Sequence, residues 1–201
     1  KWRAGCSGMG TSGSEGGPGK PTSCKADRAP RSDPYTYVST WMGFVYVAFV
    51  IDAYSRRIVG WRAARSMTTD LVLDAIEHAF FTRTQDGTTS LHGLIAHSDA
   101  GTPYTSMAFT QRLVDEGVDP SVGSVGDALD NALAETTVGS FNNEVIRRQG
   151  PWRDVNQVEL ATAEWVVWFN TERPHEYLDD FTPEAVENLH YDHRRTPPKA
   201  G

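Results

Sequence analysis

Beyond a low-complexity start, hydrophobic and polar positions follow one another in blocks that predict strands and then helices. A β-branched and aromatic stretch at residues 36–40 is followed, after a break at Gly43, by eight consecutive apolar residues at 44–51. An unbroken apolar run is typical of a strand buried on both faces beside a helix layer. Residues 57–61 predict a third strand after a hairpin turn, whose backbone we expect Asp52 to cap.

Helical and strand patterns alternate along the rest of the chain. After Thr68 or Thr69, either of which can cap a helix, apolar residues recur at helical spacing. Short strands are predicted at residues 94–97 and 120–122, and helices at 107–116, at 128–148 and from Asp154 onward, where a capping-box pattern begins. In this order the elements predict an α/β domain with a mixed five-stranded sheet and helices on both of its faces.

The first 34 residues contrast with this pattern. They contain seven Gly, four Pro and five Ser without apolar periodicity, and such a composition cannot offset its ordering entropy by burial. We therefore expect residues 1–34 to be a disordered tail or linker, residues 35–190 a folded domain and residues 191–201 a disordered C-terminal tail. Six Lys or Arg against three Asp or Glu give the first segment a charge of +3, which we interpret as a solvated linker.

Composition and charge argue against several classes of protein. The 201 residues carry 19 Lys and Arg against 26 Asp and Glu, a formal charge of −7, which does not fit a basic nucleic-acid-binding module. No apolar run approaches the roughly 20 residues of a membrane-spanning helix, so no membrane partner is expected. Cys6 and Cys24 fit neither a zinc-ligand spacing nor a disulfide framework, and a reducing, intracellular setting is expected.

Two carboxylates stand at positions that suit chemistry. Asp99 directly follows a predicted strand, and ligands gather where buried strands end. Glu135 lies in the predicted helix at 128–148, with Asn131 four residues before it and Asn142 seven after, all on one helical stripe. Taken alone, these residues also fit a solvated helix face and an Asx-type turn at Asp99.

Four strings of residues keep a characteristic order and spacing. HSDAGTPY contains Asp99, SVGSVGDALDNALAE ends at Glu135, and 35 residues separate the two carboxylates. YVAFVIDAYSRRIVGW precedes these strings and WFNTERPH follows them. Together, over roughly residues 36–187, they resemble the catalytic core of the integrase-type transposases of bacterial insertion sequences, whose signature is D,D,35,E. This family belongs to the ribonuclease-H-like superfamily, which includes retroviral integrases.

The resemblance implies a ribonuclease-H-like fold and an enzyme of DNA transposition. Family members use carboxylates to hold two divalent metal ions, Mg²⁺ or Mn²⁺, for an in-line phosphoryl displacement. In this scheme Asp99 and Glu135 each bind metal. The implied reaction is metal-dependent nicking at the ends of the element and strand transfer to target DNA. The implied partners are DNA and further copies of the chain, assembled on it in the bacterial cytoplasm at the nucleoid.

The first carboxylate of the signature is displaced in this sequence. The family carries it two residues before the Thr-Tyr-Val string that begins at Thr36, after a Trp-x-x lead-in, and Pro34 stands at that position. Asp33 is one residue further away, and a one-residue slip turns a side chain to the other face of a sheet. A β-bulge or a late strand start would make Asp33 the third catalytic, metal-binding carboxylate; the alternative is a turn at Asp33 and Pro34.

The resemblance also assigns DNA contacts to Asn131, Asn142, Arg173 and His175. At position 142 the family carries Lys or Arg, and Asn offers a phosphate a hydrogen bond without a charge, so binding should be weaker and less salt-dependent. Arg173 and His175 also fit local packing. The helix-turn-helix segments by which the family recognises element ends are expected upstream, and residues 1–34 contain none.

Three functions stay open at this point. The first is a transposase catalytic domain for DNA integration, in a truncated or degenerate copy. The second is an inactive remnant that associates with DNA or with other subunits, and the third is a metal-dependent nuclease of the same fold. Residues 1–34 are then a frameshift product, a fusion, a rearrangement or a genuine linker.

Overall fold

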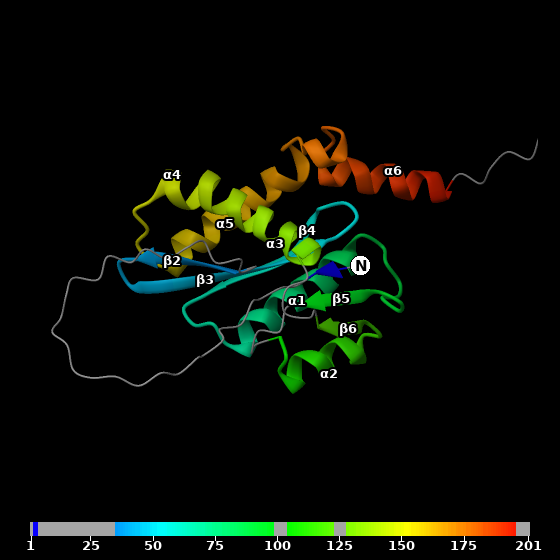
Figure 1. Cartoon of the computed structure of the whole chain (residues 1–201), viewed down its shortest axis with the longest axis horizontal. Helices are drawn as coiled ribbons and strands as arrows, with labels where there is room; N and C mark the ends of the chain where they lie inside the picture. The colour runs from blue at the N-terminus through cyan, green and yellow to red at the C-terminus, as the bar shows by residue number, and fades with distance from the viewer. Residues whose placement is uncertain (1, 4–34, 99–103, 123–127, 196–201) are drawn as a thin grey trace, which may run out of the picture.

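A mixed sheet lies between two layers of helices (Figure 1). The computed structural model describes residues 2–3, 35–98, 104–122 and 128–195. Helices that precede residue 120 cover one face of the sheet, and helices that follow residue 127 cover the other. This layering agrees with the α/β fold expected from the alternation of strand and helix patterns.

Three antiparallel strands form one half of the sheet. They are β2 (Tyr35–Thr40), β3 (Gly43–Asp52) and β4 (Ile58–Ala64), with β3 in the middle. The apolar run lies in β3 and is buried from Val45 on, apart from the half-buried Tyr46. The prediction of a strand covered on both faces is therefore confirmed.

The turn from β3 to β4 is held by Asp52, as expected. Its Oδ1 accepts hydrogen bonds from the backbone N–H groups of Tyr54 and Ser55, at 2.8 and 2.9 Å. Such an Asx cap satisfies backbone donors that a tight turn leaves unpaired.

Two parallel strands, β5 (Ile95–Ser98) and β6 (Asp119–Val122), form the other half of the sheet. They are connected by α2 (Met107–Asp115), whose N-terminus is capped by the Ser106 hydroxyl. β1 (Trp2–Arg3) lies between the two halves, antiparallel to β3 and parallel to β5.

β1 corrects two expectations. Among the described residues the sheet has six strands rather than five, and two residues of the segment assigned to a linker, Trp2 and Arg3, form a central strand. Two residues carry no periodicity that a sequence pattern can detect. Their place is set by pairing with distant strands.

The first helix layer consists of α1 (Thr69–Gln85) and α2, packed on β3, β4 and β5. The predicted stripe of α1 is buried, with Val72, Ile76 and Ala79 at most 3% exposed. α1 approaches β4 so closely at Gly60 that a Cβ there would collide with the carbonyl oxygen of Ala75. Glycine at this position therefore permits the contact between strand and helix.

The second layer begins with one long helical run. α3 (Ala128–Phe141) continues through a π-helical turn, η1 (Asn142–Ile146), into the short α4 (Arg147–Gln149). The helix predicted at 128–148 is thus present, with a π-helical turn in its C-terminal part. α5 (Val155–Thr171) follows, with its N-terminus capped by Asp154, whose Oδ1 accepts from the N–H of Gln157 at 3.0 Å.

The C-terminal part packs on this second layer. A 3-10 turn, η2 (Glu176–Leu178), leads into α6 (Pro183–Arg195), so the helix runs five residues past the boundary expected at 190. Among the described residues, no helix is long and apolar enough to span a bilayer.

Candidate active site

The carboxyl end of β5 carries the first candidate position. β5 ends at Ser98, which is buried, and the next residue, Asp99, lies outside the described residues. Nδ1 of His97 lies 3.3 Å from the Oγ of Ser121 on β6. Side chains of adjacent strand residues point to opposite faces, so this contact and the buried Ser98 hydroxyl lie on different sides of the sheet.

Glu135 is placed by α3 above the sheet. Ala134, Val138 and Phe141 are buried and attach the helix to the core, whereas the Glu135 side chain is exposed. The ring of Phe141 meets that of Phe49 on β3, with centroids 5.3 Å apart. Packing therefore fixes α3 on the sheet, and the side chain of Glu135 projects from this helix into solvent.

Asn142, two helical turns after Glu135, contacts β2. The buried Thr36 donates a hydrogen bond from Oγ1 to Oδ1 of Asn142, at 2.7 Å. Further along both segments, the N–H of Trp41 donates to the carbonyl oxygen of Trp152, at 3.0 Å. From the first contact to the second, the residue number rises in both segments, from Thr36 to Trp41 and from Asn142 to Trp152. β2 and the helical run from α3 to α4 therefore point in the same direction, as Figure 1 shows.

Tracing both segments backward from the Thr36–Asn142 contact brings the candidate positions together. In the sequence, the position of the signature's first carboxylate is two residues before Thr36, one residue before β2 begins and outside the described residues. Seven residues back along α3, about 10.5 Å, is Glu135. Tyr35 pairs with Ala48, so the sequence position one residue before Tyr35 is counted opposite the next residue of β3, Phe49. The ring of Phe49 packs under α3. Glu135 thus lies on the same face of the sheet as Phe49.

Asp33 is one residue earlier in the sequence than the position counted opposite Phe49. One residue further back is the position opposite Val50, which packs in the cluster beneath α1, whereas Phe49 packs in the cluster beneath α3 and α5. Directly opposite residues of paired strands share a face. Asp33 lies outside the described residues, as Asp99 does, and its role as a catalytic residue and metal ligand stays a prediction.

Arg173 and His175 both pack locally. Nη2 of Arg173 lies 2.9 Å from Oε1 of Glu144, and its guanidinium lies 5.5 Å from the centroid of the Phe169 ring. The ring of His175 meets that of Phe169 at 4.5 Å, and its Nε2 lies 3.3 Å from the carbonyl oxygen of the same residue. Burial, together with the charge of Arg173, lowers the pKa of His175 below its ordinary value.

These contacts support the local-packing interpretation of Arg173 and His175. Contact of either residue with DNA stays a prediction, as it does for Asn142 and for Asn131, which lies in α3.

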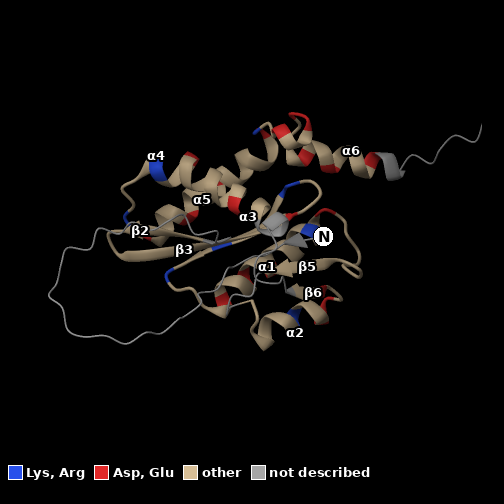
Figure 2. Cartoon of the chain, viewed as in Figure 1, with Lys and Arg blue, Asp and Glu red and all other residues tan. Residues whose placement is uncertain are grey.

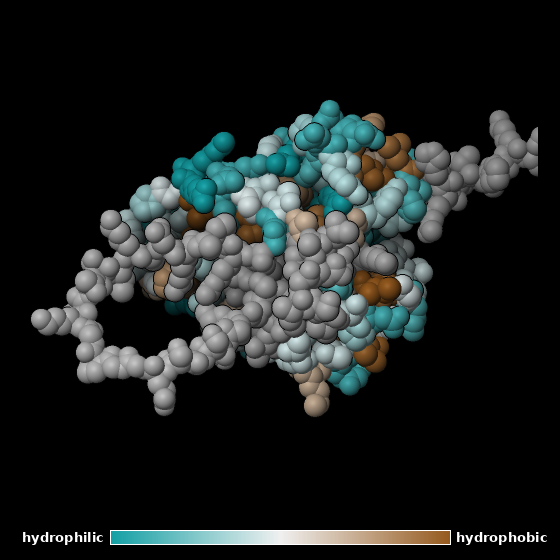
Figure 3. Space-filling view, viewed as in Figure 1, coloured by the Kyte–Doolittle hydropathy of each residue, from teal (hydrophilic) through white to brown (hydrophobic). Residues whose placement is uncertain are grey.

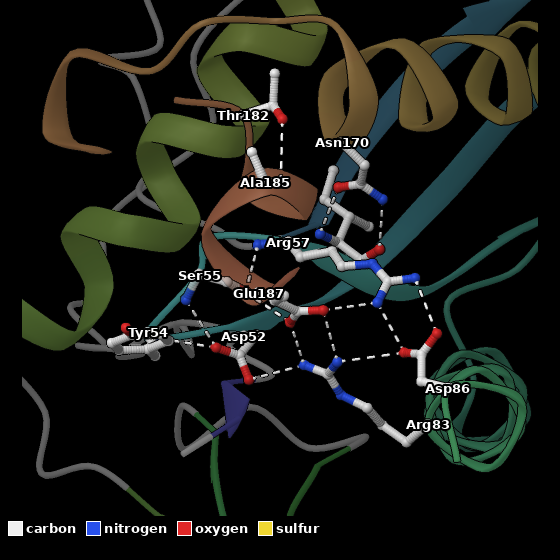
Figure 4. Close-up of polar contacts among 11 residues, drawn as sticks. Asp52, Tyr54, Ser55, Arg57, Arg83, Asp86, Asn170, Thr182, Ala185 and Glu187 are labelled. Atoms are coloured by element: carbon white, nitrogen blue, oxygen red, sulfur yellow. Dashed lines mark hydrogen bonds and ion pairs between the residues drawn. The ribbon is translucent and has the colours of Figure 1, made fainter. Parts of the chain in front are cut away.

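A network of ion pairs lies near Asp52, the residue of β3 that pairs with Trp2 of β1 (Figure 4). Arg83, on α1, lies 2.9 Å from Asp52 and 2.7 Å from Glu187 on α6. Arg57, just before β4, lies 2.7 Å from Glu187 and 2.7 Å from Asp86. The network therefore ties α6 to α1 and to the end of β3.

Each buried charge in this network faces an opposite one. Burial alone raises the pKa of Glu187, but hydrogen bonds and the charges of Arg83 and then Arg57 outweigh it and lower that pKa below its ordinary value. The Ser55 hydroxyl adds a hydrogen bond to Glu187, at 2.8 Å.

Sequence reasoning did not find this network. The available signal was Arg83, a charge on the buried stripe of α1, since an arginine on an apolar stripe needs a buried partner.

The described residues alone do not form a metal site. Among them, no three His, Cys, Asp or Glu side chains are arranged so that they could hold a metal ion. Of the three candidate ligands, only Glu135 lies among the described residues.

Charge is spread over the described surface. Figure 2 shows acidic residues along α6 and the segment before it, with basic residues at scattered points elsewhere. On the face shown in Figure 3, apolar residues form small separate spots near α6 and at the edge beside β5. Residues 35–201 contain 13 basic and 23 acidic residues. On the described part of this face, the basic residues do not gather into a broad stripe.

Comparison with known proteins identifies relatives along most of the chain. Two family models, both described as "Integrase core domain", match residues 32–128 and 116–183. A putative transposase for insertion sequence element IS986/IS6110 of Mycobacterium tuberculosis is 53% identical over 162 residues, 81% of this chain and 58% of that protein. The transposase for insertion sequence element IS629 of Shigella sonnei is 47% identical over 157 residues, 78% of this chain and 51% of that protein. The chain thus spans little more than half the length of these relatives.

Solved structures share the fold at low sequence identity. The catalytic core domain of BIV integrase matches with a TM-score of 0.53 and 17% identity, covering 79% of this chain and 95% of that one. The HTLV-2 integrase catalytic core domain in complex with magnesium matches with a TM-score of 0.53 and 13% identity, covering 76% and 90%. These likenesses confirm the ribonuclease-H-like fold expected from the motifs. The two family models and the sequence relatives indicate the same family, and the chain belongs to the integrase core family of insertion-sequence transposases.

Proposed function

We propose that this chain is the catalytic domain of a transposase that nicks DNA at the ends of a mobile element and joins the freed strand to target DNA. The observation that carries the proposal is the placement of Glu135. This residue is exposed on a packed helix that covers the face of the sheet to which Phe49 belongs, and the signature's first carboxylate is expected opposite Phe49. Carboxylates that converge from a helix and from strand ends suit hard divalent cations.

Cofactor and partners belong to the same proposal. Two Mg²⁺ or Mn²⁺ ions per site, when bound, supply charge stabilisation for phosphoryl transfer. Asp99 and Glu135 are the residues of this chain suited to hold them. The partners are DNA and further copies of the chain, in line with the magnesium complex and the trimeric and dimeric forms named for HTLV-2 integrase.

The test is nicking of a labelled duplex that carries terminal inverted repeats, with Mn²⁺ supplied. We expect nicks that disappear in Glu135→Gln, because the amide keeps the shape of the side chain and loses its charge. Glu172→Gln is the matched control, since Glu172 is exposed just after α5 and should leave nicking unchanged. Nicking that survives Glu135→Gln contradicts the assigned site.

A second candidate is favoured by the register of β2. When the count of the β2–β3 pairing is continued along the sequence, Pro34, which has no carboxylate, is the residue counted opposite Phe49. A remnant that associates with DNA without cutting it is therefore the alternative. Duplex binding without nicking, by a folded protein, supports this remnant. Nicked products without joined products support a nuclease.

A further inference from the structure

Two strands share one edge of β3. β4 pairs with residues 46–51 of β3 on one edge, and β2 pairs with residues 43–48 on the other. β1 pairs with Ile51 and Asp52 on the same edge as β2, because the opposite edge at Ile51 is taken by β4. β1 and β2 both run antiparallel to β3, so they lie end to end in the same direction.

The space between them on β3 is two residues long. Arg3 is opposite Ile51 and Tyr35 is opposite Ala48, which leaves Phe49 and Val50 between the paired segments. Along the chain, residues 4–34 connect Arg3 to Tyr35. A distance of two strand residues, about 7 Å, is therefore joined by 31 residues.

We infer that β1 and β2 are the two halves of one strand, interrupted by residues 4–34, and that the strand position opposite Phe49 is where this chain lacks its third carboxylate. The inference rests on the proposed function for the role of that carboxylate. Its geometric part rests on the pairing of β1, β2, β3 and β5 alone.

Three further observations place the missing carboxylate opposite Phe49. That position lies on the α3 face, where Glu135 is. β1 also pairs with β5, with Arg3 beside His97, so the position two residues on from Arg3 is level with position 99, just past the end of β5. Counted forward from Trp2, it is the fourth residue, and Trp2 thus fits the Trp-x-x lead-in. Two carboxylates on neighbouring parallel strands would then lie side by side.

The chain supplies no acid at this place from either end. Counted forward from Arg3 the residue is Gly5, and counted back from Tyr35 it is Pro34. Asp33 falls opposite Val50 in the second count, and alternation turns that position to the α1 face.

The test replaces residues 4–34 by two residues that close the gap. The Ala-Ala replacement should raise the unfolding midpoint by about 5–10 °C over the native chain, because a two-residue connection costs less closure entropy than a 31-residue one. An Ala-Ala-Ala replacement shifts the register and should lose this gain. Equal midpoints for the native chain and the two replacements, or a higher one for Ala-Ala-Ala, overturn the inference.

The face is tested with Asp in the two positions. Ala-Asp puts the carboxylate opposite Phe49 and Asp-Ala puts it opposite Val50. In titrations with Mn²⁺ alone, we expect the Ala-Asp variant to bind the ion at least about tenfold more tightly than the Ala-Ala variant. The Asp-Ala variant should match Ala-Ala, because only the position opposite Phe49 is on the face where Glu135 lies. Equal affinity for the two Asp variants contradicts the assignment.

Nicking separates this inference from the proposed function. Ala-Asp should nick at least tenfold faster than Ala-Ala, and Glu135→Gln in the Ala-Asp background should abolish the gain. If the stability and Mn²⁺ results hold and no variant nicks DNA, the split strand stands and the proposed function fails. If the midpoint does not rise, the split strand fails whatever the native chain does to DNA.

Discussion

The two ends of β1 differ in how they hold charge. At the end near Asp52, the buried Arg83 and Glu187 and the half-buried Arg57 are paired at 2.7–2.9 Å. At the end toward β2 and α3, Glu135 is exposed on a helix that apolar residues hold in place. Charges at the first end are paired with one another inside the fold, and the charge at the second is exposed to solvent, where it can meet a ligand. Substitutions at the two ends should therefore affect different measurements.

The largest effect on stability is expected at the network. Glu187→Ala leaves Arg83 and Arg57 without a shared carboxylate and should lower the free energy of unfolding by about 3 kcal/mol, the lower end of the cost of breaking a buried pair because Asp52 and Asp86 remain. Denaturant unfolding measures it. Glu184→Ala, an exposed position in the first turn of the same helix, is the control, and equal losses in the two variants would contradict the role of the network.

Acid should act on the same end of β1. Because its arginine partners outweigh burial, the pKa of Glu187 is lower in the folded chain than its ordinary value of 4.5. A carboxyl group with a lowered folded pKa stabilises the fold above its unfolded pKa, and that contribution is lost as the pH falls from about 4.5 through the folded value. Unfolding curves between about pH 6 and pH 3 should lose stability more steeply in the native chain than in Glu187→Gln. Parallel slopes would sink this expectation.

A smaller effect is expected where β2 meets η1. Thr36→Val removes the donor to Asn142 and keeps the shape of the side chain, so stability should fall by about 1 kcal/mol, the net value of a hydrogen bond. Thr171→Val is the control, because its hydroxyl is exposed and bonds only within α5. Denaturant midpoints of the two variants decide it, and a loss no larger than the control's would mean that the 2.7 Å contact contributes nothing.

The smallest effect on stability is expected at Glu135. Glu135→Gln should change the free energy of unfolding by less than about 0.5 kcal/mol, as is usual for an exposed side chain. The same variant should abolish nicking. A loss of stability as large as that of Glu187→Ala would remove the contrast between the two ends.

Particular elements show what the sequence could and could not predict. β3 was predicted from its apolar run, because burial on both faces leaves a mark on every residue. The placement of Glu135 on a helix followed from local pattern and motif. β1 was missed, because two residues hold their place only through pairing with β3 and β5. The Glu187 network was missed for a related reason, since its members come from α1, the β3–β4 turn and α6, and only folding makes them neighbours.

β1 also determines how the sheet is expected to come apart. Within the described residues it is the one strand that pairs with both β3 and β5, through two residues on each side. Regions with few connecting hydrogen bonds open first, and such units exchange their amide hydrogens together. The amides of β5, β6 and α2 should therefore exchange as one cooperative unit, earlier than those of β3 and β4.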